Sequence, residues 1–293
     1  MKNFKGTFTA LITPFKNEKI DYASLDRLMK QQLDGGVTGF VVNGTTAESP
    51  TLESGEVAEL FKHVRKFCGP DVPLIVGTGS NSTAKTTEDS KKAEALGADA
   101  ILVVVPYYNK PPQRGLYEHF KAVASSVKIP TILYNVPGRT ITSLEPATIA
   151  SLAKVPGVIG IKEASGKINL AEEIIKGCGK DFVMLSGDDG TYVEFLGAGG
   201  HGVISVASHI IPKQMVQWRQ WVLEGKIDQA RGDINKYMDL INLLFVEANP
   251  IPVKKALQIM GIIDSASLRL PMMELSPEHT EVLKTEMKRV GLV

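Results

Sequence analysis

A chain of 293 residues with 43% hydrophobic and 22% charged residues has the composition of a soluble globular protein, and one (β/α)8 barrel commonly fills this length. Its 33 lysines and arginines against 32 aspartates and glutamates leave a net charge of +1, which excludes the strong field that attracts nucleic acid or an anionic membrane and favours a small-molecule partner. The two cysteines, Cys68 and Cys178, each lie near the end of a predicted helix and are too few for a disulfide framework. The sequence has no apolar leader and no apolar run near the roughly 18 residues of a membrane span. We therefore expect a cytoplasmic protein without disulfides.

Short apolar segments rich in β-branched residues alternate with helical segments along the chain. This alternation is typical of βα units around a parallel sheet, and several segments are apolar throughout, as expected of strands buried on both faces. Eight such segments occur, which is the number of strands in a (β/α)8 TIM barrel. The predicted strands span residues 8–13, 39–42, 74–77, 100–105, 131–135, 158–162, 182–187 and 202–206.

The segments between these strands are amphipathic, and the chain continues with helical patterns after the last strand. Leu25, Leu28, Met29 and Leu33 form one apolar stripe that suits the outside of a barrel, and apolar residues between 234 and 245 recur at helical spacing. Ser276 followed by proline predicts the cap and first turn of a last helix. We therefore expect a catalytic barrel at residues 1–225 and a C-terminal helical appendage at 226–293 packed on it.

An open, doubly wound sheet is the alternative α/β architecture, and it requires a glycine-rich phosphate loop directly after its first strand. Gly197, Gly199 and Gly202 fit the G-x-G-x-x-G spacing, but they follow a predicted helix and lead into a strand, which is the reverse order. Residues 160–167 resemble a Walker loop, yet Ile168 stands where serine or threonine is needed. Both observations favour the barrel.

Lys162 is the first candidate for chemistry, because the active site of a barrel lies at the C-terminal ends of its strands. It ends the apolar segment 158–162, so we expect its side chain in the mouth of the barrel. Burial there disfavours the ammonium ion and leaves a neutral amine that can attack a carbonyl. The alternative is a structural lysine that pairs with a carboxylate such as Glu163. This strand alone leaves the two interpretations open.

Other strand ends carry polar groups that suit carbonyl chemistry. Tyr134, on the strand before Lys162, could shuttle a proton, although a tyrosine at this position is commonly a packed ring. Thr45 and Thr46 offer hydroxyl and backbone N–H groups to a carboxylate or a proton relay, or they cap a plain turn. The planar guanidinium group of Arg139 suits a substrate carboxylate, and a surface salt bridge is the alternative interpretation.

Metal chemistry has weaker support. Asp188 and Asp189 follow the seventh predicted strand, but we expect them to cap the next helix. The five histidines show no ligand spacing of the H-E-x-x-H kind. We predict no metal site and no cofactor.

The motifs at these strand ends resemble those of the dihydrodipicolinate synthase family, within the N-acetylneuraminate lyase superfamily of barrel aldolases. The resemblance covers essentially the whole chain, and so many motifs in the same order make it specific. They are Gly44-Thr45-Thr46, Pro106-Tyr107-Tyr108-Asn109, and the segments 134–140 (YNVPGRT), 160–164 (GIKEA), 185–189 (LSGDD), 199–205 (GGHGVIS) and 249–254 (NPIPVK).

The resemblance implies a Schiff-base (class I) lyase that condenses pyruvate with L-aspartate 4-semialdehyde, in the biosynthesis of diaminopimelate and lysine. Pyruvate forms an imine with Lys162, and the enamine attacks the aldehyde. By the same resemblance, Tyr134, Thr45 and Tyr108 form a proton relay. Tyr108 is supplied across a tight dimer interface, and homotetramers built from two such dimers are common.

The resemblance also implies how the substrates are held. Thr46 binds the carboxylate of pyruvate, and Arg139 holds the carboxylate of the semialdehyde. Gly187 and Ile204 line the pocket through their backbones. One departure lies beside this site, because Ala47 stands where the family motif G-T-T-G-E has glycine, which raises the question of a positive φ at that position.

A second departure concerns inhibition by lysine, which sensitive members bind at the dimer interface. The positions that fit this allosteric site are Ser49, Leu52, Asn81 and Tyr107. Ser54 and Val57 replace two histidines, however, and Lys85 replaces a glutamate. A lysine ligand needs an anion for its ammonium group, and a cation at position 85 repels it. We therefore predict little or no inhibition by lysine.

Two other functions remain as alternatives. An N-acetylneuraminate lyase or a keto-deoxy-sugar-acid aldolase would share Lys162 and Tyr134, but such relatives typically lack an arginine at the position of Arg139. A non-catalytic ligand-binding barrel is the alternative from another class, and loss of the lysine or the tyrosine would have favoured it. The sequence retains both residues.

Overall fold

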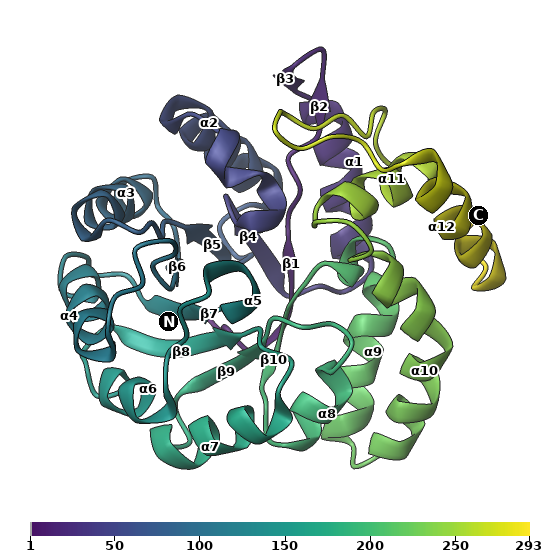
Figure 1. Cartoon of the computed structure of the whole chain (residues 1–293). Helices are drawn as coiled ribbons and strands as arrows, with labels where there is room; N and C mark the ends of the chain where they lie inside the picture. Colours follow the sequence, from purple (N-terminus) through teal and green to yellow (C-terminus); the bar gives the residue numbers. More distant parts are fainter. Residues whose placement is uncertain (1) are drawn as a thin grey trace. The chain divides into compact units, whose positions relative to one another are not determined.

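The computed structural model describes residues 2–293, and its eight parallel strands form a closed barrel in the order β1-β10-β9-β8-β7-β6-β5-β4 (Figure 1). The predicted (β/α)8 TIM barrel is therefore confirmed. The strands are β1 Gly6–Ala10, β4 Gly39–Val42, β5 Leu74–Gly77, β6 Ala100–Val104, β7 Thr131–Asn135, β8 Val158–Glu163, β9 Val183–Ser186 and β10 Gly202–Ser205.

Seven of the eight strands agree with their predicted ranges to within one residue at each end, and the first lies earlier than predicted. It begins at Gly6, whose N–H donates to the carbonyl of His201 (3.1 Å), and a Cβ on Gly202 would lie 2.0 Å from the Gly6 carbonyl oxygen. Glycine gives no apolar signal, so the sequence pattern missed this start. The antiparallel pair β2 Phe15–Lys16 and β3 Lys19–Ile20 was also not predicted.

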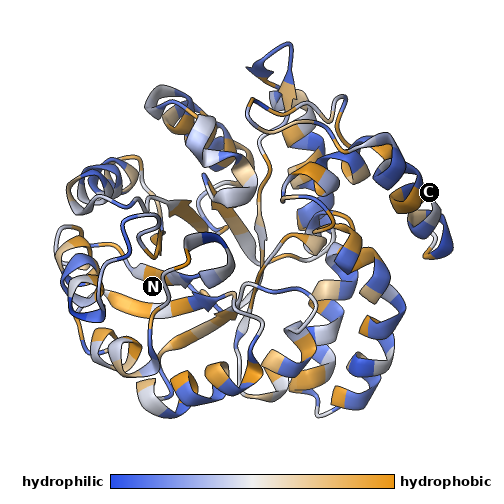
Figure 2. Cartoon of the chain, in the orientation of Figure 1, coloured by the Kyte–Doolittle hydropathy of each residue, from blue (hydrophilic) through white to orange (hydrophobic). Residues whose placement is uncertain are grey.

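One compact unit consists of the N-terminal residues up to Gly6 and residues 73–204. Its helices are α3 Thr83–Ala95, α4 Gln113–Ala124, α5 Pro137–Thr140, α6 Pro146–Leu152, α7 Ile168–Cys178 and α8 Tyr192–Gly197. Buried side chains recur at helical spacing, as with Leu116, Phe120 and Val123 of α4. In Figure 2 the strand β9 is coloured as hydrophobic and α3 mainly as hydrophilic, as expected for an inner strand and an outer helix.

The other compact unit consists of residues 7–72 and 205–293. Its helices are α1 Tyr22–Asp34, the 3-10 turns η1 Thr45–Ala47 and η2 Ser49–Thr51, α2 Ser54–Cys68, the 3-10 turn η3 Ala207–His209, α9 Pro212–Leu223, α10 Ile227–Leu243, α11 Ile251–Ile259 and α12 Pro277–Arg289. The predicted stripe of α1 is buried at Leu25, Leu28 and Met29. Leu33 is only half-buried, and Gln32 is buried instead because its side chain bonds Thr9 Oγ1 (2.6 Å) and the His209 carbonyl (3.1 Å).

The C-terminal segment is helical, as the apolar spacing predicted. The helix α10 buries Ile234 and Ile241, and α12 starts with Pro277. The Ser276 side chain caps α12 by accepting a hydrogen bond from the N–H of His279 (3.2 Å), so the predicted cap is confirmed.

The two cysteines are free thiols, and each is the last residue of a helix, Cys68 of α2 and Cys178 of α7. Burial raises the pKa of both thiols to about 11. None of the helices within residues 2–293 combines the length and the apolar character that a membrane span requires.

Candidate functional site

Lys162 and Tyr134 lie side by side at the C-terminal ends of β8 and β7. The two strands pair in parallel with Tyr134 opposite Lys162, after a register irregularity between Thr131 and Ile132 that adds one residue to β8. Both side chains are 7% exposed, and Lys162 Nζ lies 4.4 Å from the centroid of the Tyr134 ring. The structure thus brings the predicted nucleophile and its predicted proton shuttle together.

Glu163, the carboxylate that the structural interpretation of Lys162 named, is hydrogen-bonded to other residues. Glu163 Oε2 accepts a hydrogen bond from Asn135 Nδ2 (2.7 Å), and its Oε1 accepts one from the N–H of Ser165 (2.6 Å). No ion pair of Lys162 occurs among residues 2–293. The side chain of Lys162 is therefore held mainly by packing, with its ammonium group over the Tyr134 ring.

Gly187 makes room for the stem of this lysine. Its N–H donates to the Glu163 carbonyl (2.7 Å), which brings the backbone after β9 close to the end of β8. A Cβ at position 187 would lie 2.8 Å from Lys162 Cε and 2.5 Å from Ala164 Cβ. Only glycine fits this approach without displacing the lysine. Ile204, on β10, is 1% exposed.

Arg139 lies on the short helix α5, directly after β7, and its side chain is exposed. The segment around it is internally bonded, since Thr140 Oγ1 donates to the carbonyl of Thr142 (2.7 Å). The chain returns to the core at Leu144, whose N–H donates to Asn135 Oδ1 (3.0 Å). Arg139 thus lies on an ordered turn that starts and ends beside Asn135, at the C-terminal end of β7.

Tyr107 and Tyr108 lie in the loop after β6, and both rings are exposed, Tyr108 to 88%. Tyr108 has a φ of 73°, a left-handed conformation that is unusual for an aromatic residue. Asn109 Nδ2 donates to the Asn81 carbonyl (2.9 Å), so this loop is tied to the loop between β5 and α3. The ring of Tyr108 therefore extends from a fixed loop rather than packing on its own chain.

Thr45, Thr46 and Ala47 form the 3-10 turn η1 after β4. Thr46 is buried, and its Oγ1 accepts a hydrogen bond from Asn249 Nδ2 (2.9 Å). The positive φ in this turn falls on Glu48 (59°) and not on Ala47, so the departure from glycine at position 47 creates no backbone strain.

The turn is anchored at Glu48 by a buried cluster that the sequence patterns did not reveal. Lys254 Nζ donates to the Glu48 carboxylate and to the Ser267 carbonyl (2.9 Å), and the N–H of Arg269 donates to Glu48 Oε2 (2.9 Å). Lys254 is fully buried, and this burial lowers the pKa of its ammonium group to about 8 even though Glu48 acts in the opposite direction. The only feature of the sequence that pointed to this cluster was that Lys254 ends the NPIPVK motif.

The acidic pair after β9 has a local structural role. Asp188 Oδ1 accepts hydrogen bonds from the N–H (2.9 Å) and Oγ1 (2.8 Å) of Thr191, and Thr191 is the N-cap residue of α8. The predicted capping by Asp188 was therefore wrong in detail, because the carboxylate closes the turn before the helix. Residues 2–293 contain no cluster of three His, Cys, Asp or Glu side chains that could hold a metal ion.

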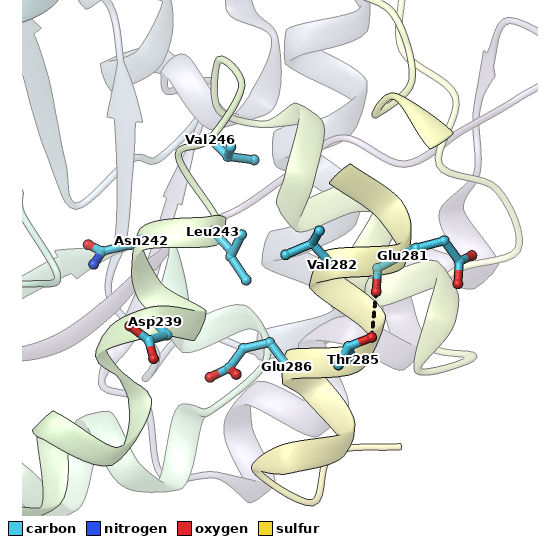
Figure 3. A pocket seen from close by; sticks show the side chains of 8 residues that line it. All are labelled: Asp239, Asn242, Leu243, Val246, Glu281, Val282, Thr285 and Glu286. Atoms are coloured by element: carbon cyan, nitrogen blue, oxygen red, sulfur yellow. Dashed lines mark hydrogen bonds between the residues drawn. The ribbon is translucent and has the colours of Figure 1, made fainter. Parts of the chain in front are cut away.

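A groove of about 660 Å³ between α10 and α12 is a separate concave surface (Figure 3). Leu243 and Val282 point toward one another across it, and acidic side chains such as Asp239 and Glu281 border it. It contains none of the strand-end residues that carry the predicted chemistry. We therefore assign the candidate active site to the strand ends and not to this groove.

The closed parallel barrel with a buried lysine beside a tyrosine at its strand ends is the arrangement that a barrel enzyme acting through a lysine imine needs. The chain belongs to the dihydrodipicolinate synthetase family, whose model matches residues 3–290. The 4-hydroxy-tetrahydrodipicolinate synthase of Bdellovibrio bacteriovorus is 78% identical over 293 residues, which is 100% of both chains.

Solved structures agree with this assignment. The dihydrodipicolinate synthase of Thermotoga maritima is 42% identical, with a TM-score of 0.97 over 99% of both chains. The chloride-inhibited dihydrodipicolinate synthase of Acinetobacter baumannii, solved in complex with pyruvate, is 40% identical, with a TM-score of 0.96 over 99% of this chain and 100% of that one. These are the folds and sequences to which the chain is similar.

Proposed function

We propose that the chain is a lyase that condenses pyruvate with L-aspartate 4-semialdehyde to give 4-hydroxy-tetrahydrodipicolinate, in the biosynthesis of diaminopimelate and lysine. The observation that carries this proposal is the buried Lys162, which forms no ion pair with a carboxylate of residues 2–293 and whose Nζ lies 4.4 Å from the centroid of the Tyr134 ring. The name of the Bdellovibrio relative and the pyruvate complex of the Acinetobacter relative support it.

The chemistry starts at Lys162 Nζ, which attacks the ketone carbon of pyruvate and forms a carbinolamine. Loss of water gives the imine, and loss of a proton from the methyl group gives the enamine. The enamine carbon bonds to the aldehyde carbon of the second substrate, whose oxygen takes up a proton. The amino group of that substrate then attacks the imine carbon, and the ring closes as Lys162 is released.

Proton transfers in this sequence need a donor and an acceptor beside Nζ. We assign this role to Tyr134, whose ring centroid lies 4.4 Å from Nζ, and to Thr45 and Tyr108 as the rest of the relay, with Tyr108 supplied by a partner chain. Thr46 binds the pyruvate carboxylate, and Arg139 binds the semialdehyde carboxylate through its planar fork.

Several further features belong to this proposal. Gly187 and Ile204 line the pocket through their backbones. The chain assembles as a cytoplasmic homotetramer of two dimers, with a catalytic barrel at residues 1–225 and a helical extension at 226–293. The 88% exposure of Tyr108 supports a partner at this loop, because a fixed aromatic ring in water gains nothing from its own chain. Light scattering during size exclusion measures the number of chains.

The direct test is to incubate the protein with pyruvate and borohydride and to measure its intact mass. Reduction of the imine leaves pyruvate covalently attached to Lys162, and peptide mapping identifies the site. The Lys162→Arg variant keeps the charge but cannot form the imine, so we expect no adduct and a kcat lower by at least about a thousandfold. An unmodified wild-type chain would exclude the imine mechanism.

Turnover with L-aspartate 4-semialdehyde, compared with sialic acid and keto-deoxy-gluconate, then distinguishes this synthase from the sugar-acid aldolases. We expect activity with the semialdehyde and a strong loss of that activity in Arg139→Ala. Preferred turnover of either sugar acid would instead assign the chain to the sugar-directed branch.

A further inference from the structure

Asn135 and Glu163 form a second pair of strand-end residues, each one position after Tyr134 and Lys162. Asn135 stands opposite Glu163 in the same parallel register that places Tyr134 opposite Lys162. Because side chains alternate along a strand, the two pairs point to opposite faces of the sheet. Asn135 is 0% exposed and Glu163 is 3% exposed, so their hydrogen bond is shielded from water.

The bond from Asn135 Nδ2 to Glu163 Oε2 (2.7 Å) joins β7 to β8 at the level of the reactive pair. The other oxygen of Glu163 accepts from the N–H of Ser165 (2.6 Å), which holds the turn after β8. The other side of the Asn135 amide, Oδ1, accepts from the N–H of Leu144 (3.0 Å). The Asn135 side chain, on the strand of Tyr134, therefore connects that strand to the strand of Lys162 and to the end of the segment that carries Arg139.

The donors and acceptors in this chain of bonds have one possible arrangement. The N–H groups of Ser165 and Leu144 can only donate, so each end of the network needs an oxygen. Glu163 supplies oxygen on both sides, and Asn135 must then turn its oxygen to Leu144 and its NH2 group to Glu163. A buried network with every group satisfied is rigid, and one wrong donor leaves a group unpaired.

We propose that Asn135 and Glu163 are positioning residues, whose hydrogen bond fixes the register of Lys162 with Tyr134 and the placement of the Arg139 segment for the condensation. This inference rests on the proposed function, because it assigns roles relative to that reaction. Neither residue touches the reacting atoms. Their effect is transmitted through the two strand ends and through Leu144.

The test exchanges the donor and the acceptor of the hydrogen bond between Asn135 and Glu163. Glu163→Gln alone must keep its oxygen on Ser165 and so faces the Asn135 NH2 group with its own NH2 group. Asn135→Asp alone faces the Glu163 carboxylate with a second carboxylate. The double variant Asn135→Asp with Glu163→Gln restores every bond, because the new Gln donates to the new Asp while Leu144 and Ser165 keep their oxygen acceptors. The double change also preserves the net charge of the pair.

We expect each single variant to lower kcat/KM for L-aspartate 4-semialdehyde by about tenfold to a hundredfold, with slower borohydride trapping of pyruvate per folded chain. A higher KM for the semialdehyde would report the displaced Arg139 segment. The double variant should recover to within about threefold of the wild type. Asn169→Asp, an exposed change of the same chemistry at the start of α7, is the matched control and should leave all constants unchanged.

Thermal melting of all variants separates positioning from plain stability. If both single variants melt earlier but keep wild-type constants per folded chain, the pair is merely structural and the inference is overturned. A double variant that fails to recover, folded or not, also overturns it. If the wild type itself shows no pyruvate adduct and no turnover, the proposed function fails instead, and that outcome is visible before any variant is made.

Discussion

Lys162 and Gly187 show how closely single residues are fitted at the barrel mouth. The lysine stem occupies the space that a side chain at position 187 would need, since a Cβ there would lie 2.8 Å from Lys162 Cε. Backbone on one side and the Tyr134 ring on the other leave the stem little freedom. The absence of a side chain at 187 is thus part of how Nζ is aimed.

We expect Gly187→Ala to lower kcat by about tenfold or more and to destabilise the fold by about 1–3 kcal/mol, because the new methyl group must displace the lysine stem or Ala164. Steady-state kinetics and urea denaturation measure the two effects. Gly232→Ala on α10 is the control, because beyond its chain neighbours and the backbone of its own helix no atom of residues 2–293 lies within 4 Å of the added methyl group, and helical alanine is favoured over glycine. Equal kinetics in the two variants would contradict the predicted fit.

His209 makes the stability of the protein depend on pH. It is fully buried, and its Nδ1 donates to the Val206 carbonyl (2.8 Å) while its Nε2 accepts from the N–H of Ile12 (3.2 Å). A second proton on the ring would have to go on Nε2, where it would face the N–H of Ile12. Burial lowers the pKa of His209 to about 4 from 6.5. The unfolded chain therefore binds a proton in the range between these values that the folded chain does not, and stability falls as the pH drops through it.

From about pH 7 to about pH 5 this residue should remove about 2 kcal/mol from the free energy of unfolding. Denaturation of wild type and His209→Gln at both pH values isolates the contribution, because the other titrating groups are common to both proteins. The loss between the two pH values should be smaller in the variant by about that amount. An identical pH dependence in the two proteins would show that His209 does not titrate as described.

At the residue scale, the sequence allowed us to predict candidate reactive groups but not the hydrogen bond that joins the residues next to them. Lys162, Tyr134 and Arg139 were predicted because a polar residue at the end of an apolar strand is visible in a single sequence. The bond between Asn135 and Glu163 was not, since it depends on a register that includes the extra residue in β8. No sequence pattern marks that irregularity.

At the scale of elements, the threonine turn after β4 depends on a segment about 200 residues further along the chain. Asn249 bonds Thr46, and Lys254 of α11 bonds Glu48, the residue that ends the turn with a φ of 59°. These contacts join the turn to the C-terminal helices within one compact unit. The segment after the last strand therefore holds the threonine turn in place through Asn249 and Lys254.

Lys254→Met should destabilise the protein by about 3–5 kcal/mol, because it leaves the Glu48 carboxylate buried without its cation. Lys255→Met is the matched control: Lys255 pairs with the half-exposed Glu274 (2.9 Å), whose carboxylate stays in water when the lysine is removed, so the loss should be about 1 kcal/mol or less. Urea denaturation compares the two variants, and adding Glu48→Gln to Lys254→Met should recover part of the loss. Similar midpoints for the Lys254 and Lys255 variants would contradict the buried pair.

Element types were predictable because strands and helices differ in the period of their apolar residues. Seven strands were placed within one residue, and the cap of α12 was read from Ser276 and Pro277. The start of β1 and the ribbon β2–β3 carry no such period, because Gly6 has no side chain and the ribbon strands have two residues each. Long-range contacts such as Lys254 with Glu48 leave no local signal at all.

At the scale of the whole molecule, we expect the enzyme to be insensitive to lysine. The family resemblance puts Lys85 at the position where a lysine ligand needs an anion, and its Nζ already pairs with Asp89 (2.8 Å) on α3. Assays with millimolar L-lysine should therefore show unchanged rates, and Lys85→Glu should bind lysine more tightly than wild type by calorimetry. Strong inhibition at micromolar lysine would overturn this prediction.

The raised pKa values of Cys68 and Cys178 bear on how the protein can be handled in the laboratory. With pKa values of about 11, only roughly one thiol in ten thousand is a thiolate at about pH 7, against roughly 3% for an ordinary exposed cysteine. A cysteine introduced at the exposed position of Asn169 should react with maleimides well before either natural thiol. A single fluorophore or spin label can then be attached where an experimenter chooses, with both native cysteines left in place.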